Sequence, residues 1–314
     1  MPRFEPHPPR RPTIVAGASS GIGEATAVEL AARGFPVALG ARRTEKLAKL
    51  VDKICADGGE AVAFALDITD PQSVKSFVAQ SIDALGEIEV LVSGAGDMFP
   101  GRLHEISTDA FAEQIHIHLV GANRLATAVL PDMVARRRGD VIFVGSDVAL
   151  RQRPHMGAYG AAKAGLIAMV TNLQMELEGT GVRASIVHPG PTLTGMGWKL
   201  SPAQVGPMLE DWDKWGHARH NYFLRPVDIA RAIAFVTETP RGSIVVNMEV
   251  QPEAPLTDAP AEHRELKLDQ ATMRAETALP GDDAGREAAR GGAGQADPGG
   301  AGQSDPGEEG MPKK

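Results

Sequence analysis

The sequence predicts an α/β fold of the Rossmann type: a doubly wound, mostly parallel sheet of seven strands with helices on both faces. Short apolar stretches alternate with longer amphipathic stretches along residues 13–252, as strands and helices do in such folds. A glycine-rich turn separates the first strand from the first helix. Polar residues follow several strands directly, and open α/β sheets bind ligands at the carboxyl ends of their strands. We therefore expect a ligand site along one edge of the sheet.

The predicted elements follow one another with short connections. Each strand is a short apolar run, as expected for strands covered by helices on both faces. The second helix has Thr44 as its expected N-cap and Cys55 on its apolar face. Strands are expected at residues 13–16, 36–41, 61–66, 89–93, 140–145, 183–187 and 243–250. Helices are expected at residues 24–33, 44–57, 73–85, 109–134, 159–177 and 226–238.

The chain divides by composition into three parts. Residues 13–252 hold nearly all the strongly apolar sequence and are expected to form one domain. A proline-rich arm, residues 1–12, precedes it. Residues 253–314 are expected to be a largely disordered, low-complexity tail, because residues 281–314 contain no Val, Ile, Leu or aromatic side chain.

Composition excludes several classes of protein. The formal net charge of −8 gives no sign of a basic face for nucleic acid, and we expect the Arg10-Arg11 pair to be a solvated surface or a helix end and not a binding patch. No stretch is apolar for the roughly 18 residues of a membrane span, and we expect a soluble, cytoplasmic protein. The single cysteine, Cys55, cannot form an intramolecular disulfide. No set of side chains has metal-ligand spacing, so we expect no metal site.

The first turn, GASSGIG, carries glycines at positions 17, 21 and 23 between a strand and a helix. Glycine lets the backbone approach a ligand closely, and free N–H groups at a helix start attract phosphate. The spacing differs from the usual G-x-G-x-x-G, and a purely structural turn is the alternative. The residues expected to contact a dinucleotide here are Gly17, Ser19, Ser20, Gly21, Ile22 and Gly23.

Arg42 and Arg43 follow the second strand, at the corner that faces the adenosine ribose in a doubly wound sheet. An acidic residue there binds the 2′-hydroxyl of NAD(H), whereas arginine accommodates the 2′-phosphate of NADP(H). The sequence thus favours NADP(H) over NAD(H). The alternative is a solvated pair of arginines at the start of a helix.

Two further strand ends carry cofactor candidates. Asp67, followed by Ile68, could bind the adenine amine or could instead cap the next helix, which starts near Asp70-Pro71. Gly94, Ala95 and Gly96 follow the fourth strand, where small residues let the backbone pass close to a flat ligand.

Ser146 ends the fifth strand, and Tyr159 and Lys163 lie four residues apart at the start of the next helix. Residues with this spacing share one helix face, so the phenol and the ammonium are expected side by side. A neighbouring cation favours the phenolate and lowers the tyrosine pKa toward a useful range. Tyr-x-x-x-Lys alone is common, and a surface helix carrying both by chance is the alternative.

Together these motifs resemble those of the short-chain dehydrogenase/reductase superfamily, in its compact branch of about 250 residues. The resemblance covers residues 13–252 and rests on the order of the motifs. GASSGIG resembles the cofactor loop, with Ala16 in place of the usual threonine. GAG at residues 94–96 resembles the end of Asn-Asn-Ala-Gly, with Ser93 and Gly94 replacing both asparagines.

The resemblance implies roles for the polar residues. Tyr159 would be the general acid in carbonyl reduction and the base in alcohol oxidation. Ser146 would hold the substrate oxygen, and Lys163 would lower the tyrosine pKa and bind the nicotinamide ribose. Around the nicotinamide the family places a Pro-Gly loop and nearby hydroxyls, here Pro189, Gly190, Thr192 and Thr194.

One departure from the family concerns the proton relay behind the lysine. His118 stands where the family has a helical asparagine. Imidazole also donates and accepts hydrogen bonds, so we expect a modified relay and retained activity. The alternative is a drifted position in an impaired enzyme.

The segment of about residues 195–225 contains all three tryptophans and one of the two tyrosines, in a chain that is 4% aromatic. The resemblance implies a mobile lid over the substrate here, and amphipathic aromatic side chains suit an apolar pocket. Packing against a partner subunit is the alternative. The pocket candidates are Met98, Phe99, His155, Met156, Trp198, Trp212, Trp215 and Tyr222.

The sequence thus predicts an NADP(H)-dependent oxidoreductase that acts on a hydrophobic carbonyl or secondary alcohol, and a homodimer or homotetramer. The alternative is a catalytically impaired dinucleotide-binding protein with a regulatory or scaffolding role, which the replaced residues Ala16, Ser93, Gly94 and His118 leave open.

Overall fold

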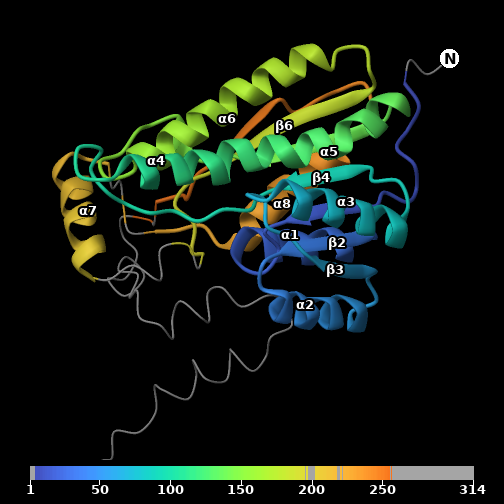
Figure 1. Ribbon diagram of the computed structural model, residues 1–314, viewed down its shortest axis with the longest axis horizontal. Coiled ribbons are helices and arrows are strands. Elements are labelled where there is room, and N and C mark those ends of the chain that lie inside the picture. The colour runs from blue at the N-terminus through green and yellow to red at the C-terminus, as the bar shows by residue number, and fades with distance from the viewer. Residues whose placement is uncertain are drawn as a thin grey trace, which may run out of the picture.

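The computed structural model describes residues 4–194, 196, 202–217, 220, 222–254 and 256, and only the backbone of 202–204. Seven strands form one parallel sheet in the order β3-β2-β1-β4-β5-β6-β7, which confirms the predicted doubly wound fold (Figure 1). The strands are β1 (Thr13–Ala16), β2 (Val37–Ala41), β3 (Ala61–Ala65), β4 (Val90–Ser93), β5 (Gly139–Val144), β6 (Val182–Pro189) and β7 (Asn247–Val250).

The order of strands reverses between β1 and β4. The chain runs outward from β1 to β2 and β3, then returns to place β4 on the other side of β1 and continues to β7. The helices that follow β1 and β4 lie on opposite faces of the sheet, and doubly wound sheets bind ligands in a crevice at such a point. Gly17 follows β1 and Gly94 follows β4, so both predicted loops lie where this crevice is expected.

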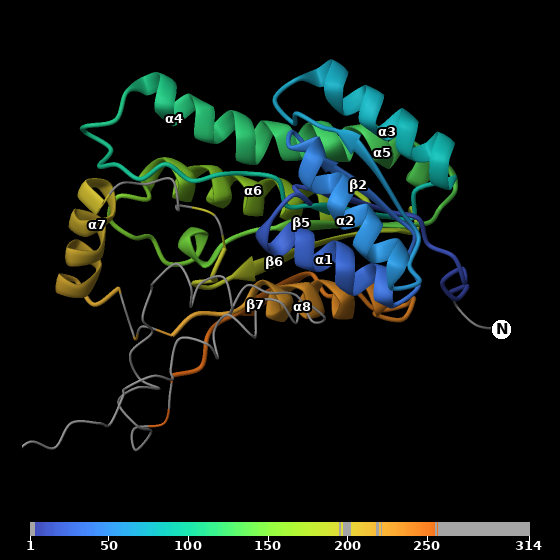
Figure 2. The same cartoon turned by 90° about the horizontal axis from the view of Figure 1, so that it is seen from below.

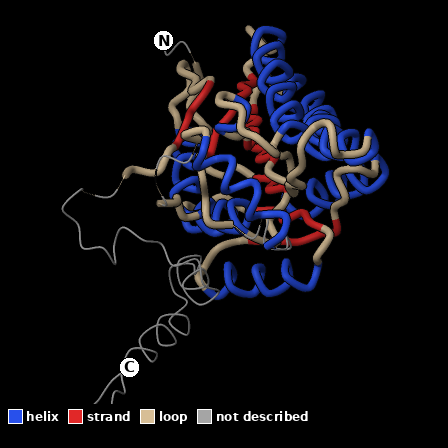
Figure 3. Tube along the Cα trace, turned by 90° about the vertical axis from the view of Figure 1, so that its left-hand side faces the viewer, coloured by secondary structure: helices blue, strands red, loops and turns tan. Residues whose placement is uncertain are grey.

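Helices cover both faces of the sheet (Figures 2 and 3). The apolar side chains of α1, α2 and α8 pack with one set of strand residues, and those of α3, α5 and α6 pack with the other. The helices are α1 (Gly21–Ala32), α2 (Thr44–Ala56), α3 (Pro71–Leu85), α4 (Thr108–Ile115), α5 (Gly121–Ala135), α6 (Gly157–Glu176), α7 (Pro202–Lys214) and α8 (Pro226–Glu238). Between α4 and α5 lies a π-helical turn, η1 (His116–Val120), and a short 3-10 turn, η2 (Asp147–Ala149), follows β5.

Two expectations for α2 are wrong. Thr44 is the first residue of the helix and not its cap, because Arg43 occupies the N-cap position without a side-chain cap bond. Cys55 is exposed, since α2 turns Leu47, Leu50 and Ile54 toward the sheet. The apolar stripe of this helix is therefore narrower than expected.

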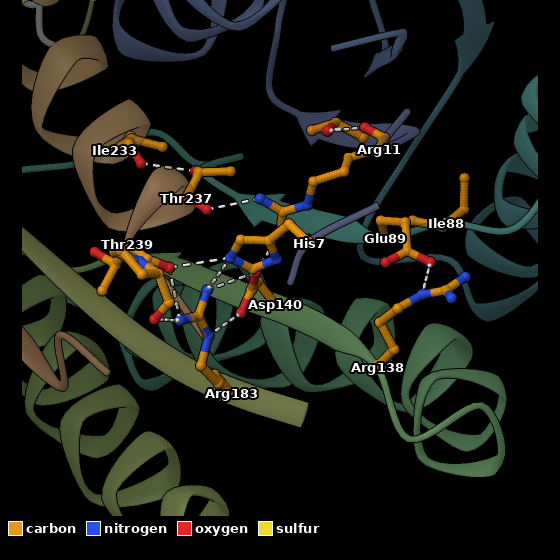
Figure 4. A network of polar contacts seen from close by, with 12 residues as sticks. His7, Arg11, Ile88, Glu89, Arg138, Asp140, Arg183, Ile233, Thr237 and Thr239 are labelled. Atoms are coloured by element: carbon orange, nitrogen blue, oxygen red, sulfur yellow. Dashed lines mark hydrogen bonds and ion pairs between the residues drawn. The ribbon is translucent and has the colours of Figure 1, made fainter. Parts of the chain in front are cut away.

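The arm that precedes β1 is anchored at the amino ends of the strands (Figure 4). Arg11 is 5% exposed and forms an ion pair with Asp140 of β5, and it donates a hydrogen bond of 2.7 Å to Thr237 O. Arg183 of β6 pairs with the same carboxylate at 2.5 Å. The expectation of a solvated Arg10-Arg11 pair is thus wrong for Arg11, while Arg10 is half exposed.

The predictions for the tail and for Trp198 lie outside the described residues. Within the described part of the chain, no helix has the length and apolar character needed to span a membrane.

Candidate active site

The turn after β1 leaves almost no space beside its glycines. Gly17 has a φ of 88°, and a Cβ built there would lie 2.7 Å from Ala95 Cα in the loop after β4. A Cβ on Gly23 would lie 2.3 Å from Gly17 O. The absence of a side chain on Gly17 lets the loops after β1 and β4 come together, and the absence of one on Gly23 lets the turn pack against the start of α1. The arrangement suits an anionic group such as phosphate.

Arg43 reaches from the end of β2 across to this turn. Its Nη2 donates hydrogen bonds of 2.8 Å to Ser19 Oγ and 2.7 Å to Ser20 Oγ. The side chains of Arg42 and Arg43 are exposed, and Arg42 lies near enough to Asp67 to help lower the pKa of its carboxyl. A cluster of guanidinium and hydroxyl donors therefore borders the glycine turn.

The sequence predicts that Asp67 either binds the adenine amine or caps the next helix, α3. Asp70 is the cap of α3, because its carboxylate accepts a 2.9 Å hydrogen bond from Gln72 N. Asp67 Oδ1 instead accepts hydrogen bonds from the backbone and hydroxyl of Thr69, which lower its pKa. Ile68 is buried next to it and packs against Gly121 of α5. Binding of adenine by this pair stays a prediction.

Ser146, Tyr159 and Lys163 come together at the carboxyl end of β5. All three are buried, although each carries a polar group at the end of its side chain. Lys163 Nζ donates a 2.6 Å hydrogen bond to Val144 O and lies 5.7 Å from the centre of the Tyr159 ring. Ser146 Oγ accepts a 3.2 Å hydrogen bond from Val148 N, and the Ser146 side chain also hydrogen-bonds to Tyr159. The phenol, the hydroxyl and the ammonium thus converge on one point.

Burial shifts the pKa values of this group. It raises the pKa of Tyr159 to about 12, and the hydrogen bond from Ser146 only partly offsets this. It lowers the pKa of Lys163 to about 7. The net direction for the tyrosine pKa is opposite to the one expected from its spacing to the lysine, because removing the phenolate from water outweighs the hydrogen bond from Ser146.

The Pro-Gly loop after β6 closes the crevice from the other side. Gly190 N donates to Val250 O at 2.8 Å, and Thr192 Oγ1 donates to Gly190 O at 2.8 Å. Thr194 lies opposite the glycine turn, since a Cβ on Gly21 would be 3.2 Å from Thr194 Cβ. The predicted cofactor residues of the two loops therefore face each other.

An apolar wall covers Tyr159. Its buried members are Val148, Met156 and Met208, and Met98, Val205 and Trp212 pack against them. Three of the predicted pocket residues belong to this wall: Met98, Met156 and Trp212. Val148, Val205 and Met208 are additional. Phe99, Trp215 and Tyr222 are exposed instead, and His155 bonds to Asp211.

Among the described residues, no group of three or more His, Cys, Asp or Glu side chains could hold a metal ion. The expectation that the protein has no metal site stays a prediction.

Comparison with known proteins identifies the family. Residues 11–205 match the model of the short chain dehydrogenase family. The chain belongs to this family. Its members are oxidoreductases that bind a nicotinamide dinucleotide.

Relatives of this short-chain dehydrogenase act on diverse substrates. A 2,3-dihydro-2,3-dihydroxybenzoate dehydrogenase of Bacillus subtilis is 32% identical over 240 residues, which are 74% of this chain and 91% of that protein. The glycine betaine reductase ATRR of Emericella nidulans is 31% identical over 76% of this chain, which spans only 18% of that larger protein. An alcohol dehydrogenase of Thermococcus sibiricus, solved with 5-hydroxy-NADP, superposes with a TM-score of 0.68 at 28% identity, over 80% of this chain and all of that chain.

His118 is the residue that we expect in place of the family's helical asparagine. It lies in the π-helical turn η1, is 2% exposed, and places Nε2 2.6 Å from Asp97 O. A carbonyl only accepts, so Nε2 carries the proton and Nδ1 is an acceptor. Nδ1 is buried without a partner among the described residues. Burial, aided by the charge on Lys163, lowers the pKa of His118 to about 3, so the ring is neutral.

His188 is a residue that sequence reasoning missed. It lies next to the last residue of β6, is fully buried, and places Nδ1 within 3.3 Å of both the N and the O of Ser146. Gly145 leaves room for the ring, because a Cβ there would lie 2.4 Å from His188 Nδ1. The histidine thus supports the backbone that carries Ser146. Its position directly before Pro189-Gly190 was the available signal.

Proposed function

We propose that this short-chain dehydrogenase transfers a hydride between NADP(H) and a hydrophobic carbonyl or secondary alcohol. The observation that carries the proposal is the convergence of buried Ser146, Tyr159 and Lys163 beside the crevice between β1 and β4. Burying a lysine and a tyrosine together costs stability, and such groups gather where chemistry requires them.

The residues present fit a nicotinamide dinucleotide. Gly17 and Gly23 let the turn after β1 pack closely on itself and on the loop after β4, and the start of α1 that follows this turn would bind a pyrophosphate. Gly94, Ala95 and Gly96 would border the adenosine side, and Pro189, Gly190, Thr192 and Thr194 the nicotinamide. Lys163 uses one of its three donors on Val144 O, so two remain for ribose hydroxyls. Bound there, the cofactor would supply the hydride.

In this proposal, side chains of the protein donate the proton and stabilise the negative charge that develops on the substrate oxygen. With a pKa of about 12, Tyr159 holds its proton through the neutral range and donates it to an oxygen that gains negative charge. Ser146 provides a second hydrogen bond to that oxygen. A protonated phenol favours carbonyl reduction over alcohol oxidation at neutral pH.

The preference for NADP(H) is supported by the position of Arg43. Its guanidinium already contacts Ser19 and Ser20, and Arg42 stands beside it. A 2′-phosphate would find charged and hydroxyl donors together at this corner. The archaeal alcohol dehydrogenase of similar fold was solved with 5-hydroxy-NADP.

The hydrophobic substrate is supported by the wall over Tyr159. Met98, Met156, Met208 and Trp212 offer apolar or amphipathic surface next to the phenol. Methionine adapts to differently shaped ligands, so we expect a sizeable apolar group next to the reacting carbon.

A panel of carbonyls and alcohols, followed by NADPH absorbance, tests the proposal. We expect reduction of bulky apolar carbonyls, and we expect Tyr159→Phe to lose about 100-fold or more in kcat while it still binds NADPH. The second candidate, a dinucleotide-binding regulatory protein, is favoured by His118 in the relay position. NADPH binding without turnover of any panel member in the wild-type protein would favour that candidate.

A further inference from the structure

Asp211 of α7 is bound by two side chains from other parts of the chain. Its Oδ2 accepts a 2.8 Å hydrogen bond from Arg102 Nη2, and His155 Nε2 lies 2.8 Å from the same oxygen. The hydrogen bond with His155, together with the charge of Arg102, lowers the pKa of the Asp211 carboxyl. The carboxylate therefore stays ionised and bridges both partners at neutral pH.

The bridge joins the segments that follow three adjacent strands. Arg102 lies after β4, His155 after β5 and Asp211 after β6. The first two segments are also paired directly, since Gly101 N donates a 2.8 Å hydrogen bond to His155 O. Figures 1 and 2 show α7 at the end of the molecule where these segments meet, opposite the N-terminal arm.

A second contact fixes the same helix. Trp212 Nε1 donates a 2.8 Å hydrogen bond to Pro154 O, and the Arg153 guanidinium lies 5.4 Å from the centre of an indole ring. Arg153 is held in turn by an ion pair of 2.5 Å with the buried carboxylate of Asp147. Asp211 and Trp212 thus fasten neighbouring positions of α7 to one loop.

The face of α7 beside Asp211 forms part of the wall over Tyr159. Val205, Met208 and Trp212 are spaced by three and four residues and so share one helix face. Met208 is buried against the group that contains Met156 and Tyr159. Asp211 itself makes none of these contacts. Replacing it can therefore affect the site only by changing the position of α7.

We propose that Asp211 is a positioning residue that sets substrate selectivity, by holding α7 where Met208 and Trp212 enclose an apolar group next to the reacting carbonyl. The inference rests on the proposed function. It predicts that loss of the bridge weakens the use of bulky apolar carbonyls and leaves the cofactor crevice unchanged.

The placement of α7 can be measured without turnover. All three tryptophans lie in residues 198–215, so Trp198→Phe with Trp215→Phe leaves Trp212 as the single reporter. In this background we expect Asp211→Ala to shift the emission to longer wavelength and to increase quenching by acrylamide. Asp213→Ala is the matched control, because Asp213 is an exposed acid on the same helix. Equal spectra for both variants would overturn the inference.

The partner of the bridge provides a second variant. Arg102→Ala removes the opposite charge from a different segment, and its effect on Trp212 emission should not add to that of Asp211→Ala in a double-mutant cycle. Circular dichroism of each variant verifies that it is folded. Full additivity of the two changes would contradict a shared bridge.

Kinetics then test selectivity. For a bulky apolar carbonyl we expect Asp211→Ala to raise KM about tenfold, with a smaller change for a small carbonyl and an unchanged Kd for NADPH. An active enzyme with equal selectivity in Asp211→Ala and Asp213→Ala would overturn the inference. Absence of any turnover in the wild-type protein would instead refute the proposed function, while the fluorescence result still decides the placement of α7.

Discussion

The ring of His118 meets the ring of Tyr159 edge to face, with centroids 4.9 Å apart and planes at 89°. Because His118 Nε2 is hydrogen-bonded to Asp97 O, the ring presents near the buried ammonium of Lys163 an Nδ1 acceptor that has no partner in the part of the chain that the structure describes. A neutral imidazole in this state can accept a hydrogen bond but does not store a proton at neutral pH. Its contribution to a relay is therefore that of a fixed acceptor.

Replacement of His118 tests this role. We expect His118→Ala to lower kcat about tenfold or more, and His118→Asn to retain most of it, because an amide oxygen also accepts. His116→Ala is the control, since this histidine is exposed in the same turn. The pH profile of kcat should show no inflection from His118, whose pKa is about 3. An unchanged kcat in His118→Ala would refute the relay.

Lys163 is expected to lower the free energy of unfolding, because the proposed active site requires its ammonium group to be buried. Burial lowers its pKa from 10.5 to about 7, so the unfolded chain binds the proton more strongly between these values. The free energy of unfolding then rises with pH across this window, and the full cost of the buried ammonium is present below about pH 7.

Lys163→Met should therefore raise Tm by about 5 °C or more at pH 6.5, and the gain should shrink as the pH approaches 10.5. Thermal unfolding at several pH values measures this, with Lys75→Met as a control at an exposed position of α3. A Lys163→Met variant that melts below the wild type at pH 6.5 would show that the lysine stabilises the fold.

Arg43 is expected to set cofactor preference. Loss of a charged donor to a phosphate costs about 1.5 to 3 kcal/mol. Arg43→Ala should therefore weaken NADPH binding about tenfold or more and change NADH binding little, by titration of fluorescence. Lys46→Ala, exposed in the same helix, is the control. Tighter binding of NADH than of NADPH by the wild-type protein would overturn the preference.

Arg11, which lies in the arm that precedes β1, is expected to stabilise the folded domain. Removing one member of a buried ion pair destabilises the fold, and among the described residues Asp140 would keep its ion pair with Arg183, at 2.5 Å, but lose the one with Arg11. Arg11→Met should lower the free energy of unfolding by about 3 kcal/mol in urea titrations. Arg10→Met, at a half-exposed position, should change it by about 0.5 kcal/mol or less. Equal losses in both variants would exclude a special role for the buried pair.

Much of the fold could be predicted because its signals are local. Strand β1 and helix α8 have the predicted bounds, since apolar runs and a proline at the helix start act within a few residues. The glycine turn and the Ser-Tyr-Lys spacing likewise pointed to the crevice and to the end of β5. The cofactor, the oligomeric state and the role of each site residue stay predictions.

The features that were missed depend on long-range packing. The apolar period of residues 109–134 continues through η1, so the pattern could not reveal a π-helical turn at His118. The burial of Arg11 requires Asp140, which lies far along the chain, and the Asp211 bridge requires three segments to meet. Likewise, the raised pKa of Tyr159 follows from its burial and not from its spacing to Lys163.

The contacts of the arm that precedes β1 also determine how much of the chain must be synthesised before the domain can finish folding. Arg11 bonds to Thr237 O across 226 residues of sequence, so the first part of the chain to be synthesised must wait for nearly the last part of the domain. At about 5 to 20 residues per second, that interval is roughly 10 to 45 s on the ribosome. The hydrogen bond between Arg11 and Thr237 O can therefore form only after α8 has been synthesised, whereas Asp140, the ion-pair partner of Arg11, is synthesised well before that.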